Sequence, residues 1–433
     1  MWNFRSASSS RLNLILYVAA ASPLAAATSS CLPCHAKIVE SYAKTGMARS
    51  SGRTDTLPPD PHFRHKVGGR EIQLQWFIGS GHVGRSFVHK IESHLLQAPV
   101  SYYSSAGKWQ LSPGYKDNDA QHIARPIEYP CLHCHTSGAK LEDPFAEPGV
   151  TCERCHGDAS EHIKGNLKAI VNPAKLAPRL RDSVCEQCHL TGAARVERLG
   201  RKMQDFKPGE NWSDYVATFI GTKEKAAATD HAEQIATSKC KPTCTTCHNP
   251  HEAVAATTQP CLQCHKQAHR REENCIACHM PKATTREGEH VAYTDHTIPR
   301  KPGQKRERKL QVFPGTEASE RDWALAFNRK DGLEKAVQQD DIAAIAALAQ
   351  LSNGPALYER LQRLDPNHPA LANLGVYRAM QGRTQEAIEI WQRIFTRYPW
   401  MSEVGINLLR AQLENQQVRR RLQLYHPKLQ AVP

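Results

Sequence analysis

The sequence predicts a mainly α-helical protein with many loops, in which a cysteine- and histidine-rich part contains a small inserted antiparallel β-sheet and precedes an α-helical repeat domain. Three observations predict this division. A Cys-x-x-Cys-His pattern recurs between residues 31 and 279, apolar and polar residues alternate around residue 72, and a helical pattern with a 34-residue period follows residue 317. The chain of 433 residues is long enough for two or three domains.

Residues 1–27 have the pattern of a secretory signal peptide. Arg5 and Arg11 give a basic start, Leu12–Leu24 form an apolar core, and Ala25–Ala27 offer a small-residue cleavage site. Because no later segment reaches 18 uninterrupted apolar residues, we expect membrane attachment only through an uncleaved N-terminus. The protein is therefore predicted to be exported, to the periplasm or the extracellular space.

The cysteines are grouped in one repeated motif. Fourteen of the 15 fall into seven copies of Cys-x-x-Cys-His, and Cys240 alone stands outside them. The copies are Cys31/Cys34/His35, Cys131/Cys134/His135, Cys152/Cys155/His156, Cys185/Cys188/His189, Cys244/Cys247/His248, Cys261/Cys264/His265 and Cys275/Cys278/His279. A structural zinc site does not require a histidine after the second cysteine, and a thioredoxin-type redox site uses one motif rather than seven.

This motif is typical of covalent c-type haem attachment. The two thiols form thioethers to the porphyrin, and the adjacent histidine binds the iron. The sequence therefore predicts seven covalently attached haems c, with the 14 motif cysteines as attachment sites and the seven motif histidines as proximal iron ligands. Zinc and iron–sulfur binding are the alternatives.

The charge of the chain is consistent with this prediction. The formal net charge is +13, or +11 without Arg5 and Arg11, and a basic protein suggests a nucleic-acid or membrane partner. Seven haems with two propionates each would leave about +4 when oxidised and about −3 when reduced. We therefore expect no nucleic-acid partner.

All seven motifs lie in residues 28–299, which we predict to form a heptahaem cytochrome domain whose buried apolar matter is largely porphyrin. Within it, Ile72, Leu74 and Trp76 alternate with polar residues, and glycine-rich turns flank them. Residues 63–111 are therefore predicted to be an inserted antiparallel sheet. Strand content should be low elsewhere in this domain, although ENWSDYVATF between the fourth and fifth motifs fits either a strand or a short helix.

The composition changes near residue 300. Residues 300–316 are a basic, turn-rich linker, and residues 317–433 contain no cysteine and resemble tetratricopeptide repeats. Leu374 and Leu408 are one 34-residue period apart, Gly382 marks the turn between two helices, and Pro399 ends the second. We expect about three repeats, which dock a partner, assemble the protein or cap the haem domain.

The second axial ligand decides what each haem can do. Of 22 histidines, seven follow motifs and two lie beyond the linker, which leaves thirteen candidates and makes bis-His coordination of most irons feasible. The distal candidates are His65, His162, His231, His251, His296 and Met47. We expect packing for Met280, no ligand role for His133 inside its motif, and a buried free thiol for Cys240.

Several segments together resemble the periplasmic multihaem cytochromes c of the cytochrome c-554 and doubled Cys-x-x-Cys-His type, which carry C-terminal tetratricopeptide repeats. They include CLPCHAKIVESYAKTGMARS, GVTCERCHGDASEH, SVCEQCHLTG and CIACHMPK. The resemblance implies close-packed haem pairs, mostly bis-His iron and a role in respiratory electron transfer. Relatives of this family include hydroxylamine-oxidising and nitrite-reducing enzymes. This chain lacks a Cys-x-x-Cys-Lys motif and has Met47 where such sequences tend to have a ligand histidine.

We therefore predict an electron carrier that passes electrons along closely packed haems between redox partner proteins. The alternative is a haem-dependent oxidoreductase of nitrogen or sulfur compounds in which one iron is open to substrate. The sequence names no catalytic residue, donor or acceptor.

Overall fold

The computed structural model describes residues 30–67, 70–115, 124–137, 145–221, 227, 229–253, 257–266, 274–285, 292–303, 309–412 and 415–427. The predicted signal peptide, the Gly68-Gly69 turn and residues 304–308 of the predicted linker lie outside these ranges. Helices take more of the described chain than strands do, as the sequence predicts.

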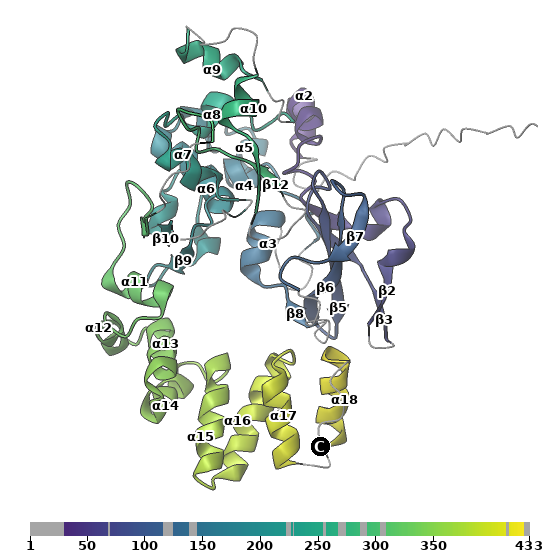
Figure 1. Ribbon diagram of the computed structural model, residues 1–433, viewed down its shortest axis with the longest axis vertical. Coiled ribbons are helices and arrows are strands. Elements are labelled where there is room, and N and C mark those ends of the chain that lie inside the picture. The colour runs from purple at the N-terminus through teal and green to yellow at the C-terminus, as the bar shows by residue number, and fades with distance from the viewer. Residues whose placement is uncertain are drawn as a thin grey trace, which may run out of the picture.

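The predicted antiparallel sheet is present between the first and second motifs, and it extends beyond residues 63–111 on both sides (Figure 1). Its strand order is β1-β4-β5-β6-β7, with β8 paired to β6. The strands are β1 (Ser51–Arg53), β4 (Trp76–Ile78), β5 (Arg85–Ile91), β6 (His94–Tyr103), β7 (Lys108–Leu111) and β8 (Arg125–Pro126). A separate hairpin joins β2 (Arg64–Val67) to β3 (Arg70–Gln73).

The alternating segment is divided between these two sheets. Ile72 and Leu74 are buried, as the alternation predicts, but Trp76 is half-buried and Phe77 is buried instead. The chain leaves the hairpin after Gln73 and enters the larger sheet at Trp76, which changes the face that is buried. Reading the segment as one continuous strand was therefore wrong.

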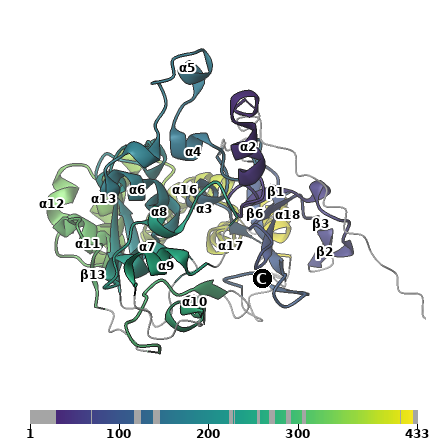
Figure 2. The same cartoon turned by 90° about the horizontal axis from the view of Figure 1, so that it is seen from above.

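The motifs lie on or beside short helices. These are α2 (Leu32–Tyr42), α3 (Tyr129–His135), α4 (Glu153–His156), α6 (Pro178–His189), α8 (Cys244–Cys247), α9 (Gln259–Cys264) and α10 (Cys275–His279), with α5 (Ser160–Ile163) and α7 (His231–Thr237) between motifs. Pro33, Pro130 and Pro260 stand in the first turn of their helices, where a missing N–H costs nothing. Figure 2 shows α2 and α5 side by side.

A second sheet follows the fourth motif, where the sequence predicts little strand. Its order is β13-β10-β9, formed by β13 (Gln311–Val312), β10 (Val216–Ile220) and β9 (Ala194–Glu197). A core of buried side chains, including Trp212 and Phe206, packs against it. This part of the chain therefore has a side-chain core of its own, and the end of the predicted linker belongs to the sheet. A short pair of strands, β11 (Lys282–Thr284) and β12 (Ala292–Thr294), follows the last motif.

The C-terminal part is a row of helices, which we call the helical array (Figure 1). It consists of α11 (Glu320–Phe327), α12 (Leu333–Gln338), α13 (Ile342–Ser352), α14 (Pro355–Leu364), α15 (Ala372–Met380), α16 (Thr384–Arg397), α17 (Ser402–Ala411) and α18 (Gln416–Tyr425). The predicted turn at Gly382 joins α15 to α16 and has φ +75°. A Cβ atom on Gly375 would lie 2.4 Å from Nε1 of Trp391, so glycine allows these two helices to approach closely.

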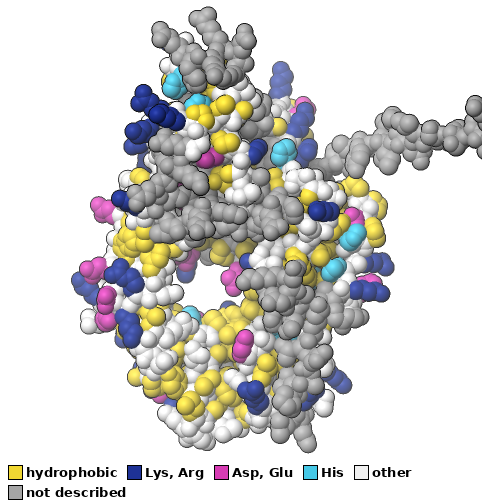
Figure 3. All heavy atoms as spheres, in the orientation of Figure 1, with side chains coloured by type: hydrophobic (Ala, Val, Ile, Leu, Met, Phe, Trp, Pro, Cys, Tyr) yellow, Lys and Arg dark blue, Asp and Glu magenta, His cyan; other side chains and the backbone are white. Residues whose placement is uncertain are grey.

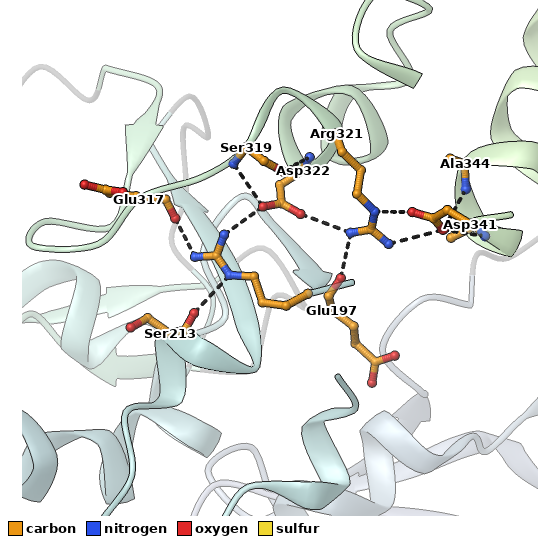
Figure 4. Close-up of polar contacts among 10 residues, drawn as sticks. Glu197, Ser213, Glu317, Ser319, Arg321, Asp322, Asp341 and Ala344 are labelled. Atoms are coloured by element: carbon orange, nitrogen blue, oxygen red, sulfur yellow. Dashed lines mark hydrogen bonds and ion pairs between the residues drawn. The ribbon is translucent and has the colours of Figure 1, made fainter. Parts of the chain in front are cut away.

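The first end of the array is fastened to the second sheet by two arginines and two carboxylates (Figure 4). Arg198, after β9, donates to Asp322 at 2.7 Å, and Arg321 donates to Asp322 at 3.0 Å and to the carbonyl oxygen of Glu197 at 2.9 Å. Arg321 also forms an ion pair with Asp341. Because both carboxylates are almost fully buried, loss of Arg321 would leave Asp341 as a buried charge without its arginine partner, whereas Asp322 would keep Arg198.

The other end of the array returns to the first sheet. Tyr425 of α18 is fully buried in the core cluster that contains Leu74 and Phe87. Arg421 forms an ion pair with Glu92 in the β5–β6 turn, with N–O distances of 2.6 and 3.0 Å. The chain thus closes into a ring, and Figure 3 shows the opening between the helical array and the rest of the molecule.

Candidate haem site

The motif cysteines are available for attachment. All 15 cysteines lie in the described part of the chain, and none of them forms a disulfide. Among the described residues, no group of three His, Cys, Asp or Glu side chains converges as a protein-only metal site would require. Cys240 is exposed, so the prediction that it is buried was wrong.

Several predicted attachment and ligand residues lie at the surface of the polypeptide. Cys34 in α2 and Cys278 in α10 are exposed, and so is His265, which directly follows α9. The other exposed motif residues are Cys131, Cys247, Cys264, His35 and His248. The polypeptide alone therefore leaves these attachment and ligand positions open to solvent.

The physical reason is the length and place of the helices that carry these residues. Helices α9 and α10 have 6 and 5 residues, and α9 stands at one end of the molecule in Figure 1. Helices this short cannot bury an apolar face of their own. Cys278 in α10 and His265 after α9 therefore remain open to solvent. Cys34 lies on the exposed first half of α2, whereas the buried residues of that helix, Val39 and Tyr42, come later. Haem attachment through Cys34 and Cys278, and iron binding by His265, stay predictions.

Two motif histidines face distal candidates across a gap of suitable width. The ring centroids of His35 and His162 are 6.3 Å apart with an interplanar angle of 15°. Those of His156 and His251 are 5.9 Å apart at 16°. Two imidazoles on opposite sides of one metal ion place their centroids about 6 Å apart, because each metal–nitrogen bond is about 2 Å long. The residues present therefore fit an iron held between each pair.

Backbone carbonyls orient some of these rings. Nδ1 of His156 lies 2.9 Å from the carbonyl oxygen of Val171, and Nδ1 of His279 lies 2.8 Å from that of Pro299. A carbonyl only accepts, so Nδ1 carries the proton in both rings and Nε2 keeps its lone pair. A hydrogen bond of this kind is what fixes the ring of a metal-binding histidine.

Four more histidines form a cluster between α6, α7 and the end of the last motif segment. His189 and His231 have centroids 5.2 Å apart, and His248 and His296 have centroids 6.1 Å apart. His296 also lies 4.7 Å from His231, centroid to centroid. The second of these pairs has the spacing of axial ligands, whereas the His189–His231 pair is closer than that spacing.

Burial keeps the imidazoles of this cluster neutral. Burial, followed by the neighbouring imidazoles, lowers the pKa of His189 to about 4 and that of His231 to about 2. Nδ1 of His296 lies 2.7 Å from the carbonyl oxygen of Thr294 and therefore carries the proton. Neutral imidazoles with free lone pairs are the form that binds a metal.

The remaining distal candidates stand apart. His65 lies in the β2–β3 hairpin opposite Ile72, and no described contact joins its side chain to a motif histidine. Met47 is half-buried, and its carbonyl oxygen accepts from the N–H of Val150 just before the third motif. The residues shortly after Met47 contact the second motif, because Ser50 and Ser51 donate to the carbonyl oxygen of His135 at 3.0 and 2.7 Å.

Two further buried histidines were not among the predicted ligands. His89 on β5 is almost fully buried with no partner on either ring nitrogen, and burial lowers its pKa to about 4. His133 is buried against Trp212 with Nε2 unpartnered, and the absence of a ligand role for it stays a prediction. Burial lowers its pKa to about 3. In the sequence, His89 directly follows the apolar residues Phe87 and Val88. In the structure all three residues are buried.

Comparison with known proteins supports haem attachment. Residues 103–157, which contain the second and third motifs, match the family described as cytochrome c554 and c-prime. The chain is also 25% identical over 199 residues to the multiheme cytochrome MtrA of Shewanella baltica (strain OS185), covering 38% of this chain and 56% of that protein. Over these segments the chain is similar to multihaem cytochromes, which are haem proteins.

The similarity to this multihaem cytochrome group is limited in extent. The match spans a little more than half the length of MtrA. Among solved structures, the outer cell wall cytochrome OcwA superposes with a TM-score of 0.44 and 14% sequence identity over 91% of this chain and 99% of that chain. Within the described residues, no helix is both long and apolar enough to cross a membrane.

Proposed function

We propose that this chain is an exported electron carrier that holds seven covalently attached haems, most of them between two histidines. The proposal depends on two pairs of facing imidazoles, His35 with His162 and His156 with His251. A haem iron with two imidazole ligands exchanges single electrons and leaves no coordination position open to a substrate. The polypeptide then supplies orientation, ligands and a low-dielectric surrounding.

The distal residues also link one site to the next. His162 follows the motif residue His156 by six positions but faces His35 of the first motif. His251 follows His248 by three positions but faces His156 of the third motif. Each distal histidine is therefore held by the segment of a neighbouring motif. The first, third and fifth motifs form a continuous series in which each site is tied to the next by a few residues.

We further propose that residues 317–433 are tetratricopeptide repeats that dock a redox partner or a second copy of the chain. The support is the row of helices and the close α15–α16 packing at Gly375. Both ends of the array are fastened to the rest of the molecule, so it also braces the two sheets. A partner would have to use the surfaces of the array that remain outside these contacts.

The alternative function is an oxidoreductase of nitrogen or sulfur compounds with one open iron. The observation that favours it is His135, whose buried Nδ1 lacks a partner and whose ring faces no second imidazole among the described residues. Met47 or an empty position would then complete that site.

Electron paramagnetic resonance of the oxidised protein distinguishes the two functions. An electron carrier is expected to show low-spin ferric haem throughout, with a spectrum that cyanide and nitrite leave unchanged. A high-spin signal that shifts when either anion is added would contradict the carrier function and support the enzyme.

A further inference from the structure

Two arginines converge on the contact between the second and fourth motifs. Arg154 stands between the two cysteines of the third motif and donates to the carbonyl oxygen of Thr136, directly after the second motif, at 3.0 Å. Its own carbonyl oxygen accepts from Nε2 of Gln187, in the fourth motif, at 3.3 Å. Arg195 is the second residue of β9, a few residues after the fourth motif, and it donates to the carbonyl oxygen of Leu190 at 2.6 Å.

The second and fourth motifs are themselves in contact. Sγ of Cys134 lies 3.9 Å from the carbonyl oxygen of Gln187, and the thiols of Cys134 and Cys188 are close neighbours. Both guanidinium groups also lie within electrostatic range of Cys134 and Cys188. Both guanidinium groups therefore lie at the junction of two attachment sites rather than beside a single one.

Neither guanidinium forms an ion pair with a carboxylate of the described residues. Other partly buried arginines are paired, as Arg179 is with Glu186 and Arg198 with Asp322. Asp230 lies within electrostatic range of Arg195, but its two carboxylate oxygens accept from the N–H groups of Gly192 at 2.8 Å and Ala227 at 2.7 Å.

Both cations are half-buried. Arg195 lies 6.0 Å from the ring centroid of Trp212, and Nε of Arg154 is buried with no hydrogen-bond partner. Water therefore screens these charges less than it screens those on the surface. A positive charge at such a site favours the state of a neighbouring haem that holds one more electron.

We propose that Arg154 and Arg195 raise the reduction potentials of the haems held by the second and fourth motifs, so that electrons collect at this pair. The inference rests on the proposed function, because it requires both motifs to carry haem. It also gives electron transfer within the protein a direction, since electrons that enter at the first or third motif move toward the second and fourth motifs, where the potential is higher.

Spectroelectrochemical titration of the intact, haem-loaded protein tests the proposal. Arg195→Gln and Arg154→Gln are each expected to move one or two components of the titration to lower potential and to leave the others in place. Arg195→Lys keeps the charge and should restore most of the wild-type curve. Arg201→Gln is the matched control, because that guanidinium is exposed on the ring of Tyr215 and its removal should change nothing.

The outcomes are separable. Curves that superimpose on the wild type would overturn the proposal, and so would an Arg195→Lys curve displaced as far as that of Arg195→Gln. A uniform shift in the potentials of all components would indicate a general change in structure instead of a local charge effect. It would also count against the proposal. If the wild-type protein showed no haem component at all, the proposed function would fail before this inference was reached.

Discussion

Replacing His251 with alanine is expected to turn one low-spin haem into a high-spin haem that binds carbon monoxide. The imidazole of His251 faces His156 at 5.9 Å with nearly parallel rings, and no other described imidazole lies against His156. Alanine cannot reach the iron, so the position opposite His156 becomes open. The third-motif cysteines still hold that haem, so the haem content should not change.

The measurement combines electron paramagnetic resonance of the oxidised variant with the carbon monoxide difference spectrum of the reduced one. The control is His82→Ala, because His82 is exposed and faces no motif histidine in the described structure. His82→Ala should match the wild type in both spectra. A His251→Ala protein that remains entirely low-spin and does not bind carbon monoxide would show that His251 is not an axial ligand.

Replacing Tyr425 with alanine is expected to release α18 from the first sheet and to lower the stability of the ring. The side chain is fully buried among sheet residues such as Leu74 and Phe87, and removal of a buried aromatic ring costs about 3–5 kcal/mol. The change also removes the phenol, which lies 2.8 Å from Nδ1 of His94 and 3.1 Å from the carbonyl oxygen of Ile91.

Thermal unfolding and limited proteolysis together measure this effect. Tyr425→Ala should unfold at lower temperature and should be cut near the end of α17 under conditions that leave the wild type intact. Tyr425→Phe keeps the ring and loses only hydrogen bonds, so its cost should be nearer ~1 kcal/mol. If the alanine variant resisted heat and protease as well as the wild type, the array would not be fastened through α18.

Local patterns in the sequence predicted much of the fold. Alternation identified Ile72 and Leu74 as inward-facing residues, and helical periodicity with Gly382 located the α15–α16 hairpin. The alternation could not show that Phe77 is buried in place of Trp76. The chain changes sheets between Gln73, which pairs with β2, and Trp76, which pairs with β1, and this change reverses the buried face. β13 was missed because its partner, β10, is about ninety residues earlier in the chain.

The candidate haem site could likewise be predicted only in part. His162 and His251 were predicted as distal ligands from their position shortly after a motif, and the structure brings each against a motif histidine. Which motif each one faces could not be predicted, because the partner belongs to a different segment of the chain. The contact between Arg421 and Glu92 joins residues over three hundred positions apart, and neither residue carries a local signal of it.

Mass spectrometry of the purified protein, followed by acid–acetone extraction, tests the central claim most directly. Seven loaded motifs predict a mass that exceeds the mature polypeptide by seven haems, with the red colour remaining in the precipitated protein. A mass equal to that of the bare polypeptide, with no colour retained after extraction, would contradict the account.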